Sequence, residues 1–241
     1  MLWPRTMGET AYVPIQTASL PAAPHHSAVV RVTHWVFTLS FLGLVVSGVA
    51  ILLAHPHFYW GETGGIGSPS LFDLPLPTVL TGQTGWGRSL HFLSAWVAVL
   101  TGLLYFVSGI LTQHFRRRLL PTGLSWRFLR AGVLDHLRFR RPVESASYNL
   151  LQRLAYLAVV FLLFPLTIVT GFAMSPVITS VIPQVVTVFG GHQSARTIHF
   201  FLADLLFLFL LVHIAMVIRA GFSSRMRAMI AGRIAARQEP T

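Results

Sequence analysis

Two histidines, His199 and His213, lie fourteen residues apart within one apolar stretch of the sequence. An α-helix turns by about 100° and rises by about 1.5 Å per residue, so fourteen residues bring a side chain back to within about 40° of its first direction and about 21 Å along the axis. A helix crossing a bilayer here would carry two imidazoles on one face, at two depths. Because a polar ring is costly to bury in lipid, such histidines indicate a functional site.

The composition predicts a membrane protein. Hydrophobic residues make up 54% of the 241 residues, charged residues make up 10%, and the mean hydropathy is positive. We expect an all-α membrane protein, a bundle of four transmembrane helices with short interfacial helices. Four stretches are long enough to cross about 30 Å of hydrocarbon: residues 32–54, 89–112, 150–173 and 196–218. Around them we expect three regions: a flexible tail (1–28), the membrane domain (29–221) and a basic amphipathic tail (222–241).

The basic residues predict the orientation. All 18 are arginines, and most lie in the two tails and in the loop between the second and third spans. By the positive-inside rule, both termini are cytoplasmic and the loops 55–88 and 174–195 are external, in a bacterial inner membrane. Contacts with lipid headgroups explain the net charge of +11 better than nucleic acid does, since no nucleic-acid motif is present. The absence of cysteine excludes thiolate metal sites and iron–sulfur clusters.

Two further histidines complete two pairs at matched depths. His34 lies near the cytoplasmic start of the first span, and His91 lies near the external start of the second. The fourth span runs inward, so we expect an outer pair, His91 and His199, and an inner pair, His34 and His213. A low-spin haem iron takes one neutral imidazole on each side. The four histidines therefore predict two b-type haems that transfer electrons across the membrane.

Three arginines each precede a proposed ligand by three residues, which places them one helical turn nearer to water: Arg31, Arg88 and Arg196. At this spacing a guanidinium can pair with the haem propionates. For Arg31 a plain topology charge is the alternative.

Two glycines share a helix face with the proposed ligands. Gly48 lies fourteen residues after His34, at the height of the outer haem, and Gly102 lies eleven residues after His91. They would let a flat ring approach the backbone, although close helix packing is an equal explanation.

The segments outside the spans have predicted roles as well. The external segment Gly61 to Gly87 is rich in glycine and proline, so we expect irregular backbone that docks a partner. Residues 176–189 suit an interfacial or re-entrant piece, and residues 116–141 and 222–237 suit amphipathic segments on the membrane surface. His55 and His57 suit a partner contact or a helix cap, with a structural metal as a lesser alternative.

The chain resembles bacterial cytochrome b561-like dihaem membrane subunits, the family of the cytochrome b subunits of nickel hydrogenases, formate dehydrogenases and thiosulfate reductases. The resemblance rests on RVTHW (31–35), GRSLHF (87–92), YNLLQRLAY (148–156), SARTIHF (194–200) and LVHIAMV (211–217). In that family the matching histidines ligate two haems with the same pairing. The resemblance also implies a quinone site at Asn149 and Gln152, with helix capping as the alternative role of Asn149. The stretch SGVAILLAHPHFYWGE (47–62) resembles members that accompany periplasmic molybdopterin enzymes.

We therefore expect a dihaem subunit, without catalytic residues of its own, that passes electrons between the quinone pool and a periplasmic oxidoreductase. One alternative is a stand-alone cytochrome b561 that oxidises superoxide or a small external donor, with quinone as acceptor. Another is a haem-free transporter or scaffold whose histidines relay protons.

Overall fold

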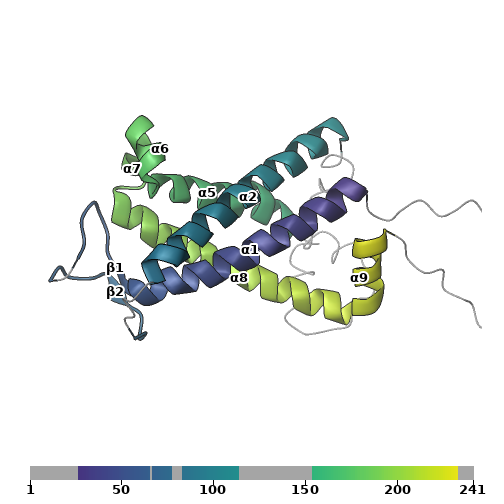
Figure 1. The fold of residues 1–241 in the computed structure, drawn as a ribbon, viewed down its shortest axis with the longest axis horizontal. Helices are drawn as coiled ribbons and strands as arrows, with labels where there is room; N and C mark the ends of the chain where they lie inside the picture. The colour runs from purple at the N-terminus through teal and green to yellow at the C-terminus, as the bar shows by residue number, and fades with distance from the viewer. Residues whose placement is uncertain (1–26, 66, 78–82, 114–153, 233–241) are drawn as a thin grey trace, which may run out of the picture.

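The structure, a computed structural model, describes residues 27–65, 67–77, 83–113 and 154–232. Within these residues it contains four helices long and apolar enough to cross a membrane, which confirms the predicted all-α, four-span architecture. The first is α1 (Ala28–Ala54), the second lies in α2 (Gln83–Leu111), the third is Leu154–Ala173 and the fourth is α8 (His192–Arg219). Figure 1 shows α1 and α2 crossing beside each other, with α5 and α8 forming the other side of the bundle.

The first span has clear stop and start signals. Ser27 caps its N-terminus by accepting a hydrogen bond on Oγ from the Val30 N–H at 3.4 Å. At the other end the His55 N–H donates to the carbonyls of Ile51 and Leu52, and Pro56 follows. Because the residue before a proline disfavours the helical conformation, the helix ends here.

The third span contains an irregular turn. Its segment η2 (Val159–Leu163) is π-helical, and α5 (Phe164–Ala173) follows directly. The Phe164 N–H donates to the Val159 carbonyl, five residues back. Pro165, the next residue, has no N–H to donate and would clash in a regular α-helix. The wider turn lets the span continue through the proline.

Small residues allow α1 and α2 to approach closely. A Cβ atom at Gly43 would collide with the Ser94 hydroxyl, and one at Gly87 would lie 3.3 Å from the Ala50 Cβ. Large apolar side chains of the same helices, such as Leu39 and Leu100, are exposed instead. This distribution is the reverse of that in a soluble protein. It is expected in lipid, where helices associate through small residues and large apolar side chains face the acyl chains.

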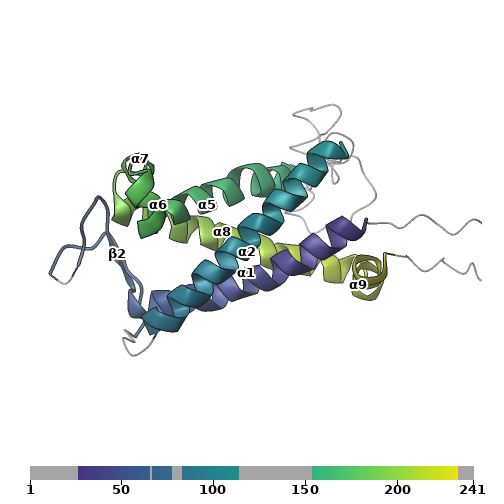
Figure 2. The ribbon, with the colours of Figure 1, turned by 45° about the horizontal axis from the view of Figure 1, so that its top comes forward.

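A small hairpin covers one end of the bundle, which we call the hairpin end. Strands β1 (His57–Phe58) and β2 (Phe72–Asp73) pair antiparallel, with Phe58 opposite Phe72. The helices α6 (Pro176–Val181) and α7 (Gln184–Thr187) lie at the same end (Figure 2). The segment predicted to be irregular, Gly61 to Gly87, thus contains β2 and the first turn of α2. The predicted interfacial piece, residues 176–189, consists of two short helices.

The opposite end carries α9 (Phe222–Ala231), so we call it the α9 end. This helix lies across the beginning of α1, after a turn at Gly221 with φ +96°. Its helical form agrees with the amphipathic tail expected over residues 222–237, of which residues 233–237 lie outside the described part. The segment 116–141 also lies outside it.

Candidate functional site

The four histidines meet in two pairs along α8. The rings of His91 and His199, the outer pair, have centroids 6.3 Å apart and planes at 63°. The rings of His34 and His213, the inner pair, have centroids 6.4 Å apart and planes at 50°. The structure therefore brings these residues together in the couples expected from their depth. Their role as haem ligands stays a prediction.

The spacing within each pair suits a shared metal ion. Imidazole nitrogens bind metals at about 2 Å, so two rings on opposite sides of one ion have centroids about 6 Å apart once the distance from each nitrogen to its ring centre is added. Both observed separations, 6.3 and 6.4 Å, agree with this value. Rings in direct stacking contact would sit closer. The residues present therefore fit a haem iron at each pair.

Glycines face the outer pair from two other helices. A Cβ atom at Gly48, on α1, would lie 4.0 Å from Cε1 of His91. A Cβ atom at Gly171, on α5, would lie 3.6 Å from Cε1 of His199. Gly48 thus lies at the predicted height, whereas Gly102 has no atom within 4 Å of such a position among the described residues. The sequence analysis did not identify Gly171.

Two hydroxyl groups also contact the outer pair, and the sequence analysis missed both. Ser47 Oγ lies 3.0 Å from Nδ1 of His91, and Thr170 Oγ1 lies 2.9 Å from Nδ1 of His199. Both side chains are fully buried. A signal was present in the sequence, because each is a polar residue within an apolar span and directly precedes a glycine, Gly48 or Gly171.

Aromatic side chains surround the inner pair. The Phe209 ring stacks on His213 with centroids 6.0 Å apart and planes at 24°. The Trp35 ring meets His34 edge-on at 5.3 Å. Phe209 also contacts Tyr156 of the third span, at 6.0 Å. The inner pair therefore lies in an apolar, aromatic setting, which suits a large planar cofactor.

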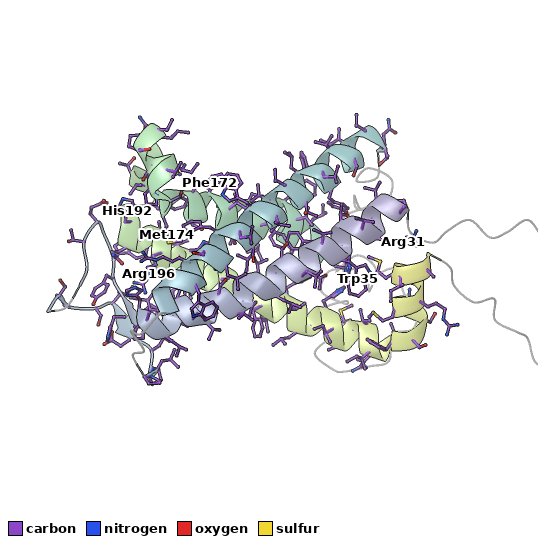
Figure 3. All side chains as sticks on the ribbon, in the orientation of Figure 1. Arg31, Trp35, Phe172, Met174, His192 and Arg196 are labelled. Atoms are coloured by element: carbon purple, nitrogen blue, oxygen red, sulfur yellow. The ribbon has the colours of Figure 1, made fainter. Side chains whose placement is uncertain are left out.

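Arg196 fastens the chain of the hairpin end onto α8. Its guanidinium donates to the carbonyl of His57 at 3.1 Å and also to the carbonyl of His55. The guanidinium carbon lies 4.9 Å from the centre of the Phe58 ring, a cation–π contact. Figure 3 shows Arg196 at this end of the bundle. Binding of a haem propionate by Arg196 stays a prediction, and in the structure Arg196 holds residues 55–58 against α8.

The first turns of α8 also hold residues 59–61 in place. Thr197 Oγ1 donates to the Tyr59 carbonyl at 2.8 Å, and the Gly61 N–H donates to Ser194 Oγ at 2.7 Å. Between these two bonds, the Trp60 side chain is 59% exposed. We call residues 55–62 with β2 the external cap, a name that follows the orientation predicted from the arginines. It presents an exposed tryptophan on a backbone fixed from both sides.

Arg31 lies at the α9 end, as Figure 3 shows. Its guanidinium donates to the Ile230 carbonyl at 3.0 Å, and the Trp35 indole N–H donates to the Met229 carbonyl at 3.3 Å. These bonds hold the last turn of α9 against α1. The propionate role of Arg31 also stays a prediction.

The remaining candidates are placed as follows. Arg88 is exposed at the hairpin end. Asn149 and Gln152 lie outside the described residues. His57 Nδ1 lies 2.7 Å from Oδ1 of Asp73, and this hydrogen bond, more than any other contact, holds the pKa of the Asp73 carboxyl below its usual range. Among the described residues no group of three or more His, Asp or Glu side chains could hold a metal ion, so the structure gives no support for a metal at His55 and His57.

Two comparisons find known proteins that are similar to this chain. The family model described as prokaryotic cytochrome b561 matches residues 25–232. A curated relative from Azospira oryzae, named putative protein-methionine-sulfoxide reductase subunit YedZ1, is 30% identical over 193 residues, which cover 80% of this chain and 89% of the relative. No solved structure matches the chain.

Proposed function

The chain belongs to the prokaryotic cytochrome b561 family and is a haem-containing, multi-pass electron-transfer subunit of the inner membrane; from this premise we propose that it carries electrons from quinol, through two b-type haems, to an oxidoreductase on the external side. The observation that carries the proposal is the placement of two histidine pairs at two levels of one helix, α8. The haems supply one-electron redox chemistry. The four histidines would hold the two haem irons.

The hairpin end is the external side in this proposal. The arginine distribution favours cytoplasmic termini, and the described chain begins and ends near α9, away from the hairpin. The external cap then faces the partner. Trp60 supports docking there, because exposed tryptophans on ordered backbone are typical of binding hot spots.

The relative's name suggests the partner and the direction of flow. We propose that the partner reduces methionine sulfoxide in proteins, as the subunit from Azospira oryzae is named for that activity. Each sulfoxide takes two electrons and two protons to give methionine and water. One quinol supplies the two electrons. Because the proposed partner consumes them on the external side, electrons flow from the quinol outward. A molybdopterin cofactor in the partner is part of this proposal and rests on the resemblance of residues 47–62.

A pyridine haemochrome assay on protein purified from membranes tests the core of the proposal. Two haems b per chain are expected, both reduced by quinol and reoxidised when the partner and an oxidised-methionine substrate are added. One haem, or none, would end the two-centre scheme. Reoxidation by superoxide alone would instead favour the stand-alone cytochrome.

Two variants test the ends of the path. Asn149→Ala should leave both haems bound and slow their reduction by quinol, whereas unchanged kinetics would remove the quinone assignment. Trp60→Ala should leave quinol reduction unchanged and weaken partner binding at least tenfold, because hot-spot truncations cost about 2 kcal/mol or more. Trp96→Ala, at an exposed tryptophan of α2 outside the segment predicted to dock the partner, is the matched control.

A further inference from the structure

Both imidazoles of the outer pair contact a hydroxyl from a helix other than their own. His91 belongs to α2, yet its Nδ1 lies 3.0 Å from Ser47 Oγ on α1. His199 belongs to α8, yet its Nδ1 lies 2.9 Å from Thr170 Oγ1 on α5. Each histidine of the outer pair is therefore contacted by a hydroxyl in the same way, although the helices differ: α1 contacts α2, and α5 contacts α8.

The remaining contacts of these hydroxyls fix the direction of the hydrogen bonds. Ser47 Oγ lies 2.6 Å from the Gly43 carbonyl, and Thr170 Oγ1 lies 2.9 Å from the Leu166 carbonyl, each four residues back on its own helix. A hydroxyl has one hydrogen, and a carbonyl can only accept it. The hydrogen is therefore donated along the helix, and the oxygen lone pairs face the imidazole. Each Nδ1 must then carry the proton and donate it. Each imidazole also has a backbone hydrogen bond, His91 with Leu44 and His199 with Thr167, so the hydroxyl is one of two partners of each ring.

We propose that Ser47 and Thr170 are positioning residues that hold His91 and His199 as neutral Nδ1–H tautomers, with each Nε2 lone pair free to bind the outer haem iron. The inference rests on the proposed function, since it assigns second partners to ligands of that haem. Such partners fix the tautomer and the ring rotation of a metal-bound histidine and raise its basicity. Burial makes the hydroxyls effective, because no water competes at either side chain.

Helical hydroxyls often donate to the carbonyl four residues back without any further role. Two residues on the same helices do this here: Ser40 donates to Val36 at 2.9 Å, and Thr167 donates to Leu163 at 2.8 Å. Among the described residues neither side-chain hydroxyl has a hydrogen bond to an imidazole nitrogen. The Thr167 backbone, which Thr167→Val keeps, does have a hydrogen bond with His199. Ser40 and Thr167 are therefore matched controls that separate the contact with histidine from the bond along the helix.

The experiment is a redox titration of purified holoprotein, with electron paramagnetic resonance of the ferric haems. Ser47→Ala and Thr170→Val each remove one acceptor and make the ligand less basic, which disfavours ferric iron. The midpoint potential of the outer haem should rise, and its low-spin signal should change because the ring is free to rotate. The inner haem should keep its potential. The component absent from His199→Ala identifies the outer haem.

Ser47→Thr and Thr170→Ser retain the hydroxyl and should restore the wild-type potential and signal. Ser40→Ala and Thr167→Val should leave both unchanged. Selective loss of the outer haem from Ser47→Ala or Thr170→Val, with both haems kept in the controls and in the hydroxyl-retaining variants, would also support the proposal. Potentials and signals unchanged in both deletions, or shifted equally in the controls, would overturn it. Those results leave the proposed function standing, because the number of haems per chain and their reduction by quinol test that function separately.

Discussion

A Cβ atom at Gly171 would lie 3.6 Å from Cε1 of His199, so the α5 backbone passes directly against an imidazole of the outer pair. A single methyl fits at that distance, but a larger side chain does not. Glycine at this position therefore keeps the space that the ring of His199 occupies.

Gly171→Val should displace His199 and lower the haem content from two to about one per chain, with the inner haem retained. Forcing extra methyl groups into a packed site costs about 1–3 kcal/mol. Gly85→Val is the control, because a Cβ atom at the exposed Gly85 of α2 has no described atom within 4 Å. Absorption spectra and the haem-to-protein ratio measure the result. Equal haem loss in the two valine variants would show a general helix effect instead.

Substitution of one histidine in each pair should remove the two proposed haems selectively. His199→Ala should abolish chiefly the outer haem and His213→Ala chiefly the inner haem, since α8 gives one imidazole to each. His192→Ala, at the beginning of the same helix, should keep both. Reduced-minus-oxidised spectra distinguish the remaining component. If either ligand variant lost both haems to the same extent, the two-level scheme would be wrong.

Arg196→Gln should loosen the external cap. The arginine donates to two backbone carbonyls, and losing hydrogen bonds to a charged group costs about 2 kcal/mol or more. We expect a lower thermal midpoint in detergent and faster proteolysis between β1 and β2. Arg219→Gln, at an exposed arginine of the far end of α8, should change neither. A wild-type proteolysis rate in Arg196→Gln would contradict the assignment.

His55, which follows α1, should resist protonation. Burial, and then the charges of Arg196 and Arg88, lower the pKa of His55 from its ordinary value of 6.5. A lowered pKa in the folded state means that the neutral ring stabilises the fold. Its contribution is complete above pH 6.5 and is lost as the pH falls through the lowered pKa. Acidification below this window should therefore destabilise the external cap.

NMR titration of the histidines in detergent measures the pKa of His55. Arg88→Gln removes one of the repelling charges, so it should raise the pKa of His55 towards 6.5. Arg219→Gln, at the far end of α8, should not. Identical titration of His55 in the wild type and in Arg88→Gln would show that the charge of Arg88 is too well screened to matter.

The sequence predicts the spans well because crossing a bilayer demands about 20 apolar residues, a requirement that local composition reveals. The adjacency of His34 to His213, and of His91 to His199, was also predictable, since topology assigns each a depth. The contacts of Ser47 and Thr170 were not, because they depend on how helices cross and rotate. The π-helical turn before Pro165 was likewise missed, as apolar periodicity does not report the width of a turn.

The hairpin shows a similar limit. A two-residue ladder such as His57 and Phe58 with Phe72 and Asp73 is too short to produce a strand pattern among glycines and prolines. It forms because Phe58 is buried between Phe72 at 4.7 Å and Phe200 at 4.6 Å. Phe200 lies on α8, so this strand depends on a partner more than a hundred residues away.

The two centres share α8, an unbroken helix from His192 to Arg219. The geometry of this single helix, about 21 Å over fourteen residues, would therefore fix how far apart the two proposed haem irons lie along it. If mutation, detergent or heat loosened the bundle, the affinity for the haems would change well before the spacing of His199 and His213 along α8 did. In the proposed scheme, the distance for electron tunnelling would thus depend on the backbone of α8 and little on the rest of the tertiary structure.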